Sequence, residues 1–477
     1  APATGEKITV ANNNFTGDHT KDTSYILTAD LVAALASNNV TVDATRTRAL
    51  ETDATGTGTG RITVTDAISW SGTGDLTLKA GAGGILINAN ITSTNATKRN
   101  LILNSDGVIT QRVTVTGANP VTGTVITVND LTVTAKGAIG LYGENDFTNL
   151  AGLTQTTAAS STATISVKNT GAINITGLVT WNSKGALTLT AGGNIAVNAG
   201  IISTATQSAR GGTDSFNNIF FADASLATSN GTITQTAAIK VGQLALTSTV
   251  GNLILNHEDN LIQLLGVVSF ESGKDFSLNT ITNLQLINGI TTTGNVNLKV
   301  GGCIGNDIGS YVTANTLTFE MNYAALRTKV VNGVVIDTSN YAGGEFYINV
   351  DHLGTSTFHT HPGRSAADDQ ALGLQLYHKK PFTITGVVDT QNGYLTIKNA
   401  LWNDAMLPGA TIGTIETTDN GKVVADRLNI YDYGVMILST SVNEVQRVKT
   451  YGRNFTLTND KKFKLSGSIE VGAGTVS

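Results

Sequence analysis

The sequence predicts an all-β fold, a parallel β-helix, and three observations point to it. Apolar and polar residues alternate over many short stretches, the pattern of strands with one buried face. The chain has 477 residues with 52 glycines and only 5 prolines, which indicates many turns between short strands. One block of sequence also occurs twice. The strand pattern alone would suit a sandwich or a barrel, but the duplication favours a solenoid, whose stacked units bury a continuous core.

The duplicated block covers residues 61–147 and 172–260. Trp70 and Trp181 align, and "LTLKAG" and "LTLTAG" follow them at the same distance. A block of about 110 residues would hold about five coils of roughly 22 residues, the coil size expected of a parallel β-helix. Each tryptophan precedes a turn containing glycine, and we expect it to pack in the core or in a groove; stacking on a ligand is the less favoured alternative.

Within each coil the apolar residues of the alternating stretches should point inward and stack on equivalents one coil away. The predicted core positions are Ile62, Val64, Leu76, Leu78, Ile85 and Ile87. Asn88 and Asn198 stand at strand ends, where stacked amides can form hydrogen bonds between coils. The pattern therefore predicts an apolar interior with polar side chains at the corners.

We expect three regions along the chain. They are an N-terminal strand or tail over residues 1–20, a repetitive β-helix over 21–312, and a continuation of the β-helix over 313–477. Aromatic residues are denser in the last region, and a longer non-repeating segment predicts an insertion near 355–382.

Two short helices are expected among otherwise β structure. The amphipathic stretch "TADLVAALASNN" (28–39) could form a helical cap over the end of the solenoid. In "SAADDQALGLQLYHKK" (365–380), Ser365 can cap a helix whose first turn carries acids.

Composition excludes several classes of partner. Charged residues make up 14% of the chain and the net charge is −5, with no basic run to neutralise nucleic-acid phosphates. No apolar run approaches the roughly 18 residues that a membrane-spanning helix needs.

The single cysteine, Cys303, permits no intrachain disulfide. The chain begins at Ala1 without a methionine, and we expect an exported protein whose signal peptide has been removed.

Several phrases resemble the repeats of filamentous haemagglutinin-type exoproteins, the adhesins of two-partner secretion systems. They are "ITVTDAISW…LTLKAG…ILINANI", "ITGLVTW…LTLTAGGNIAVNAGI" and "GENDFTNLAGL". The resemblance covers residues 20–350 in spacing more than in identity. It implies a right-handed β-helix, export to a bacterial cell surface and an adhesive role, with no chemistry attached. The Asn-Pro-Asn-type motifs of that family's secretion domain are absent from this sequence.

The segment "FHTHPGRSAADD" (358–369) resembles the signature of JAMM metalloproteases, which bind zinc through two histidines and an aspartate. The resemblance makes His359, His361 and Asp368 candidate metal ligands. Ser365 would assist an oxyanion and Glu345 is the nearest candidate base. The spacing between the proline and the serine is shorter than in that family, so a surface loop without metal is the favoured interpretation.

The function expected from the sequence is non-enzymatic, without a cofactor. Acidic residues are sparse, and no cluster suitable for glycosidic cleavage recurs from coil to coil. We expect an extracellular structural or adhesive protein that contacts a host or glycan surface. Self-association through the end coils would give a homo-oligomer or filament. The alternative is a β-helix that binds or cleaves carbohydrate through its aromatic C-terminal third.

Overall fold

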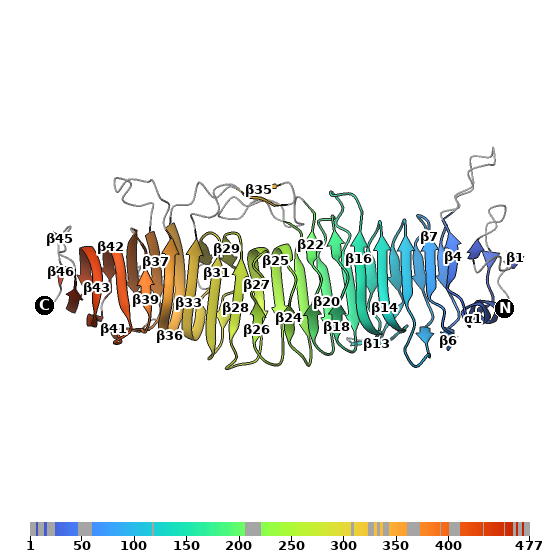
Figure 1. Ribbon diagram of the computed structural model, residues 1–477, viewed down its shortest axis with the longest axis horizontal. Coiled ribbons are helices and arrows are strands. Elements are labelled where there is room, and N and C mark those ends of the chain that lie inside the picture. The colour runs from blue at the N-terminus through green and yellow to red at the C-terminus, as the bar shows by residue number, and fades with distance from the viewer. Residues whose placement is uncertain are drawn as a thin grey trace. The chain divides into compact units, whose positions relative to one another are not determined.

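The protein is described here by a computed structural model. The described residues are 6–7, 14–16, 24–45, 60–116, 119–205, 221–306, 310–322, 329–331, 334–336, 343–359, 373–391, 393–399, 411–432, 434–452, 454–460, 464–465 and 470–471. The chain forms two compact units, residues 1–211 with 221–241 (unit 1) and residues 212–220 with 242–477 (unit 2). Both consist almost entirely of strands in parallel pairs (Figure 1).

Unit 1 contains one helix and the first strands. They are α1 (Thr28–Ala34), β1 (Glu6–Lys7), β2 (Asn14–Thr16), β3 (Ser24–Tyr25), β4 (Val40–Ala44), β5 (Ile62–Val64), β6 (Ile68–Trp70), β7 (Leu76–Ala80), β8 (Ile85–Ile87), β9 (Ile91–Ser93), β10 (Leu101–Ser105), β11 (Ile109–Gln111), β12 (Val113–Thr116), β13 (Asn119–Gly123), β14 (Ile126–Ala135), β15 (Ile139–Leu141), β16 (Asp146–Gln155), β17 (Ile165–Asn169), β18 (Ile173–Ile175), β19 (Val179–Trp181), β20 (Leu187–Ala191), β21 (Ile195–Val197), β22 (Ile201–Ser203), β23 (Ala224–Thr228), β24 (Ile233–Gln235) and the start of β25 (Ile239–Thr247).

The strands of unit 1 stack in three columns that the chain visits in turn. Column A holds β4, β7, β10 and β14, then the later part of β16, β19, β22 and β25. Column B runs from β5 through β8, β11, β15, β17 and β20 to β23. Column C runs from β6 through β9, the first parts of β14 and β16, β18 and β21 to β24. One pass of the chain through the three columns makes one coil, which is the arrangement of the parallel β-helix class.

The coil length expected from the sequence is found where no loop intervenes. Ile165 pairs with Leu187 and Ile173 with Ile195, about 22 residues on in each case. Other coils are longer; the antiparallel hairpin of β12 and β13, for example, lies between β11 and β14. The duplicated block is therefore not a whole number of coils. Its tryptophans lie on different columns, Trp70 in β6 of column C and Trp181 in β19 of column A.

The predicted core of unit 1 is buried, with one exception. Val64, Leu76, Leu78, Ile85 and Ile87 are at most 6% exposed. Ile62 is only half-buried, which corrects the prediction for that residue. Its strand, β5, pairs with β8 on one side and with no other described strand, so Ile62 has no apolar partner one coil earlier among the described residues.

Helix α1 forms within the segment 28–39 predicted to be helical, and it is shorter than that segment. It lies near the N-terminal strands of unit 1 (Figure 1) and contacts β6. Leu31 and Leu35 are buried there. The carbonyl of Leu35 accepts a hydrogen bond from Gly74 N–H at 3.1 Å, so the first coil satisfies a carbonyl at the end of the helix. No described helix is long and apolar enough to cross a membrane.

Unit 2 contains the remaining strands. They are β26 (Leu253–Leu255), β27 (Leu261–Ser269), β28 (Phe276–Thr280), β29 (Leu284–Leu286), β30 (Ile290–Thr291), β31 (Asn295–Val300), β32 (Ile304–Asn306), β33 (Val312–Asn322), β34 (Lys329–Val331), β35 (Val334–Ile336), β36 (Gly343–His359), β37 (Gly373–His378), β38 (Thr383–Ile384), β39 (Val387–Asp389), β40 (Tyr394–Asn399), β41 (Thr414–Thr417), β42 (Lys422–Tyr431), β43 (Val435–Gly452), β44 (Asn454–Asn459), β45 (Lys464–Leu465) and β46 (Glu470–Val471). Long strands bend around the coil here, since β36 pairs in parallel with β37, β38 and β39 along its length.

The helix predicted over 365–380 is wrong where the structure describes it. Gly373–His378 form strand β37, because Leu374 and Leu376 alternate with Gln375 and Tyr377 and are fully buried. Residues 361–372 lie outside the described residues. Within the segment 355–382 expected as an insertion, residues 355–359 continue β36.

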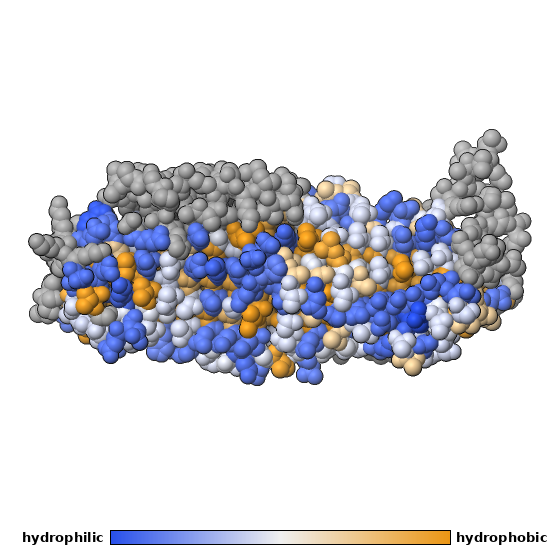
Figure 2. Space-filling model, in the orientation of Figure 1, coloured by the Kyte–Doolittle hydropathy of each residue, from blue (hydrophilic) through white to orange (hydrophobic). Residues whose placement is uncertain are grey.

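The surface of each unit mixes hydrophilic and hydrophobic residues (Figure 2). Large hydrophobic side chains are exposed one at a time, as at Leu178 in unit 1 and Val267 in unit 2. Single exposed hydrophobic residues are normal on a protein surface and do not mark an interface.

Burial of Cys303 leads to a first prediction. The side chain is fully buried in unit 2, and burial raises the pKa of the thiol from 9.0 to about 12. The unfolded chain then loses the thiol proton above pH 9 while the folded chain keeps it. We expect the free energy of unfolding to fall by up to about 1.4 kcal/mol per pH unit from pH 9 towards 12.

The measurement is urea denaturation at a series of pH values, compared with Cys303→Ser. The Ser variant should lack the part of the pH dependence that the thiol contributes. Alkylation at pH 8.5 gives a second readout, since iodoacetamide should modify Cys303 only after unfolding. Modification of the folded chain at the rate of the unfolded chain would show that the thiol is accessible.

Candidate functional site

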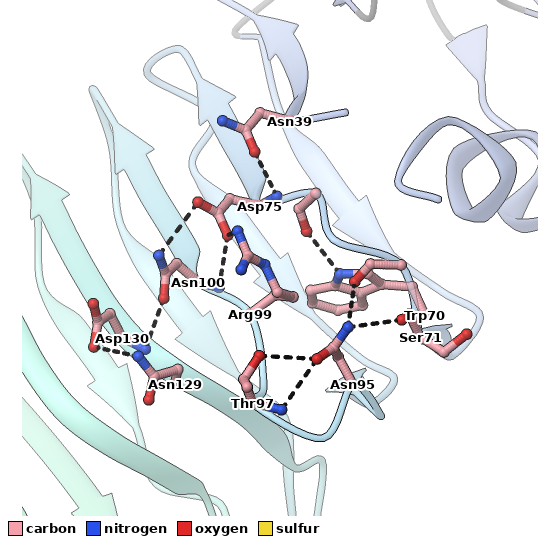
Figure 3. Close-up of polar contacts among 12 residues, drawn as sticks. Asn39, Trp70, Ser71, Asp75, Asn95, Thr97, Arg99, Asn100, Asn129 and Asp130 are labelled. Carbon is pink, nitrogen blue, oxygen red and sulfur yellow. Dashed lines mark hydrogen bonds and ion pairs between the residues drawn. The ribbon is translucent and has the colours of Figure 1, made fainter. Parts of the chain in front are cut away.

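A polar ladder, which we call the corner ladder, follows the corner between columns C and A of unit 1. Figure 3 shows its first rungs, in which an Asn or Asp oxygen accepts a hydrogen bond from the backbone of the next coil. Asn39 Oδ1 accepts from Asp75 N–H at 2.9 Å. Asp75 Oδ1 accepts from Asn100 N–H at 3.1 Å, and Asn100 Oδ1 from Asp130 N–H at 3.2 Å. Arg99 Nη2 lies 3.1 Å from Asp75 Oδ1 and adds an ion pair.

The corner ladder continues through side-chain amides. Asn149 Nδ2 donates to Asp130 Oδ1 at 2.8 Å, and Asn174 Nδ2 donates to Asn149 Oδ1 at 2.7 Å. Asn198 Nδ2 donates to Asn174 Oδ1 at 2.7 Å, and Thr236 Oγ1 donates to Asn198 Oδ1 at 3.1 Å. The prediction that the Asn198 amide bonds between coils is confirmed. Each rung satisfies a polar group of the coil beside it, so the ladder links all the coils from β4 to β24.

The ladder gives a second prediction. Asn174→Ala removes one bond that Asn174 accepts and one that it donates, so we expect the free energy of unfolding to fall by about 1–2 kcal/mol. Asn104→Ala is the matched control, because Asn104 is a half-buried outward residue of β10 in the same unit, and it should change stability by less than about 0.5 kcal/mol. Urea denaturation compares the two. Equal effects would mean that the ladder bonds add nothing.

Both tryptophans pack in the core, as the favoured interpretation of the sequence predicts. Trp70 is 1% exposed and Trp181 is fully buried. Each indole N–H donates to a carbonyl four residues on, Trp70 Nε1 to Gly74 O at 2.9 Å and Trp181 Nε1 to Gly185 O at 3.1 Å. The ring therefore fills the interior while its N–H closes the following turn.

The outward face of four neighbouring strands in unit 2 forms a second candidate surface, which we call the cationic array. It comprises Gly373, Gln375 and Tyr377 of β37, Tyr394, Thr396 and Lys398 of β40, Arg427, Asn429 and Tyr431 of β42, and Arg447, Lys449 and Tyr451 of β43, in register across the strands. The residues between them, such as Leu376, Ile397 and Ile430, are buried, and Tyr377 and Thr396 of the array itself are also buried, at 7% and 4% exposure. The twelve positions include four cations and no acid.

The aromatic side chains of the array form a column that begins on β36. Tyr347 and Tyr377 stack with their centroids 4.7 Å apart, and Tyr431 and Tyr451 stack at 5.0 Å. Lys398 lies between the two stacks, with Nζ 5.0 Å from the Tyr377 ring and 5.6 Å from the Tyr431 ring. The ring faces are thus occupied by one another and by Lys398.

The cations of the array have polar partners within the chain. Lys398 Nζ donates to Gln375 Oε1 at 2.9 Å and to the Tyr377 hydroxyl oxygen at 3.2 Å. Arg427 and Arg447 occupy directly opposite positions on β42 and β43. The carboxylate of Asp426, beside the array, forms an ion pair with Arg447. The pKa of Lys449 is raised by its hydrogen bond with Tyr451, so its ammonium group is charged at neutral pH. By register, the acids Glu345 of β36 and Glu470 of β46 flank the array.

A buried contact between a histidine and an aspartate lies in the same part of unit 2. The side chains of His378 and Asp432 are 1% and 5% exposed, with Nε2 2.9 Å from Oδ2. His378 Nδ1 lies 3.1 Å from Lys380 O, so Nδ1 carries the hydrogen. Asp432 Oδ1 accepts a hydrogen bond from Gly434 N–H at 2.8 Å. Asp432 is therefore a buried structural group.

The side chains of the predicted metal ligands lie outside the part of the chain that the structure describes. His359 is the last residue of β36, and its side chain is not described. His361, Ser365 and Asp368 lie outside the described residues, as does the side chain of Glu345. Among the described residues no three His, Cys, Asp or Glu side chains are grouped so that they could hold a metal ion.

Comparisons with known proteins give no match: no family model, curated protein or solved structure is similar to this chain. The resemblance to filamentous haemagglutinin-type repeats therefore stays a hypothesis. The described residues form an all-β framework of strands, mostly in parallel pairs, that carries the corner ladder and the cationic array.

Proposed function

We propose that the chain is a secreted, non-enzymatic protein of a bacterial cell surface with a structural or adhesive role, built as a right-handed parallel β-helix. The observation that carries the proposal is the corner ladder. Asn and Asp side chains that could serve a catalytic or ligand site in unit 1 are engaged with the neighbouring coils instead. Such a framework holds surface residues at fixed spacings, which suits contact with a large partner better than turnover of a small one.

Adhesion under flow tests the proposal. Beads coated with the purified protein would pass over surfaces that carry polysaccharide, lipid bilayer or the protein itself. We expect retention on at least one of the first two surfaces, or on the protein itself if the end coils associate. Uncoated beads are the control. Absence of retention on every surface would contradict an adhesive or self-assembling role.

The second candidate function is carbohydrate binding or cleavage. The specific observation in its favour is the aromatic column of unit 2, where tyrosines and Lys398 stand on successive strands. Cleavage would need a pair of carboxyl groups at the bound sugar, whereas adhesion needs only the binding face. The two functions differ in whether the glycan is recovered intact.

A further inference from the structure

We propose that Asn288 of unit 2 is a site of spontaneous deamidation, at which the asparagine becomes aspartate or isoaspartate. Asn288 and Gly289 connect β29 to β30, and Asn288 is exposed. Asparagine followed by glycine is the pair that deamidates most easily, because glycine has no side chain to hinder attack by its backbone nitrogen. The surroundings of such a pair in the fold then decide how fast it reacts.

The reaction joins the backbone nitrogen of Gly289 to the side chain of Asn288. The Gly289 N–H gives its proton to hydroxide, and the nitrogen attacks Cγ of Asn288. The bond between Cγ and the side-chain nitrogen breaks, and that nitrogen takes a proton from water and leaves as ammonia. Water then opens the remaining succinimide ring at either carbonyl carbon. One product is aspartate and the other is isoaspartate, and in both cases one water is consumed and one ammonia released.

The attacking nitrogen is not held by a hydrogen bond. Among the described residues the Gly289 N–H has no acceptor, whereas the next amide, Ile290 N–H, donates to Tyr311 O at 2.9 Å. Gly289 has a φ of +70°, and a Cβ atom at this position would lie 2.4 Å from Tyr311 O. The turn therefore requires glycine here, and the fold keeps the least hindered residue directly after Asn288.

The Asn288 side chain also lies outside the polar contacts that hold other asparagines of unit 2. Asn252 Oδ1, for example, accepts a hydrogen bond from Asp275 N–H at 3.0 Å. By the register of β27 and β29, Asn288 faces Val267 on the preceding coil, and this side chain has no polar group to offer. Among the described residues no group forms a hydrogen bond with the Asn288 amide, so Cγ is open to attack.

Asn420 is the internal comparison. It is also exposed and precedes a glycine, Gly421, in the turn before β42. The Gly421 N–H donates to Thr418 O at 2.9 Å, and this bond must break before the nitrogen can attack. A backbone hydrogen bond of ordinary strength corresponds to about a tenfold difference in an equilibrium. Asn288 should therefore deamidate about tenfold faster than Asn420 in the folded chain.

The test is ageing of the full folded chain at mildly alkaline pH, followed by peptide mapping with mass spectrometry and enzymatic methylation of isoaspartate. We expect the Asn288 peptide to gain the mass difference between amide and acid, to be methylated, and to react faster as the pH rises. Asn288→Asp supplies the chromatographic standard for the aspartate product. Asn288→Gln should not react on this timescale, because its longer side chain closes a ring far more slowly.

Ageing of the same chain in urea separates the fold from the local sequence. Without the fold both asparagines precede a glycine whose N–H is free, and their rates should become similar. Equal rates for Asn288 and Asn420 in the folded chain would overturn the proposal, and so would faster reaction of Asn420. An advantage of Asn288 that is just as large in urea would also overturn it, because the local sequence and not the fold would then set the rate.

Discussion

Trp181→Ala is expected to lower the free energy of unfolding of unit 1 by about 3–5 kcal/mol, the range for truncation of a large buried aromatic side chain. Trp181 is fully buried and is among the largest side chains in the core. Truncation leaves a cavity between coils and deprives Gly185 O of the indole N–H at 3.1 Å. Trp70→Ala should cost a similar amount, because Trp70 is buried and donates to Gly74 O in the same way.

Urea denaturation followed by far-UV circular dichroism measures the loss. Trp181→Phe is the matched control, since it keeps much of the ring volume while it removes the hydrogen bond and part of the indole, and it should cost clearly less than the alanine variant. If alanine cost no more than about 1 kcal/mol, the coil would close around the vacancy and the packing account of Trp181 would be wrong.

His378→Leu is expected to destabilise unit 2 by about 1–3 kcal/mol, because removal of one partner of a buried polar contact leaves the other partner unsatisfied. Asp432 is buried, and without the His378 ring its carboxylate keeps the Gly434 N–H as a hydrogen-bond donor. The ring also packs edge-on against Phe382, with centroids 5.5 Å apart. His352→Leu is the control, because His352 is a half-buried residue of β36 in the same unit.

A double-mutant cycle with Asp432→Asn isolates the pair. We expect the double variant to cost less than the sum of the two single variants, by more than about 1 kcal/mol. Additive effects would show that His378 and Asp432 do not interact, and that His378 contributes through packing alone. The unfolding midpoint of His352→Leu, measured in parallel, shows whether replacing a histidine of unit 2 by leucine is destabilising in general.

The local pattern of the sequence was enough to predict the coils. Alternation places Leu76, Leu78 and Ile85 in the core, and the tryptophans before turns are buried as expected. Asn198 joins a coil-to-coil ladder, also as expected. The aligned residue Asn88 follows β8 of column B and stands at a different corner, because the two copies of the duplicated block are shifted by one column.

The candidate surfaces could not be predicted because they depend on register between strands. Tyr377, Lys398, Tyr431 and Tyr451 are unevenly spaced in the sequence, since loops of different length separate their strands, yet they share one column. A buried pair such as His378 and Asp432 leaves no periodic signal for the same reason. Alternation predicts which side of a strand faces the core, and only the pairing shows which residues meet.

The most direct test of the central claim, that the protein acts by contact and not by turnover, is product analysis after incubation with glycans. The purified chain would be incubated with polygalacturonate, dextran sulfate and dextran, and each polymer would then be sized and assayed for new chain ends. The account predicts polymers of unchanged length, with no new chain ends. Shortened polymer with new reducing or unsaturated ends would contradict it and make the chain an enzyme.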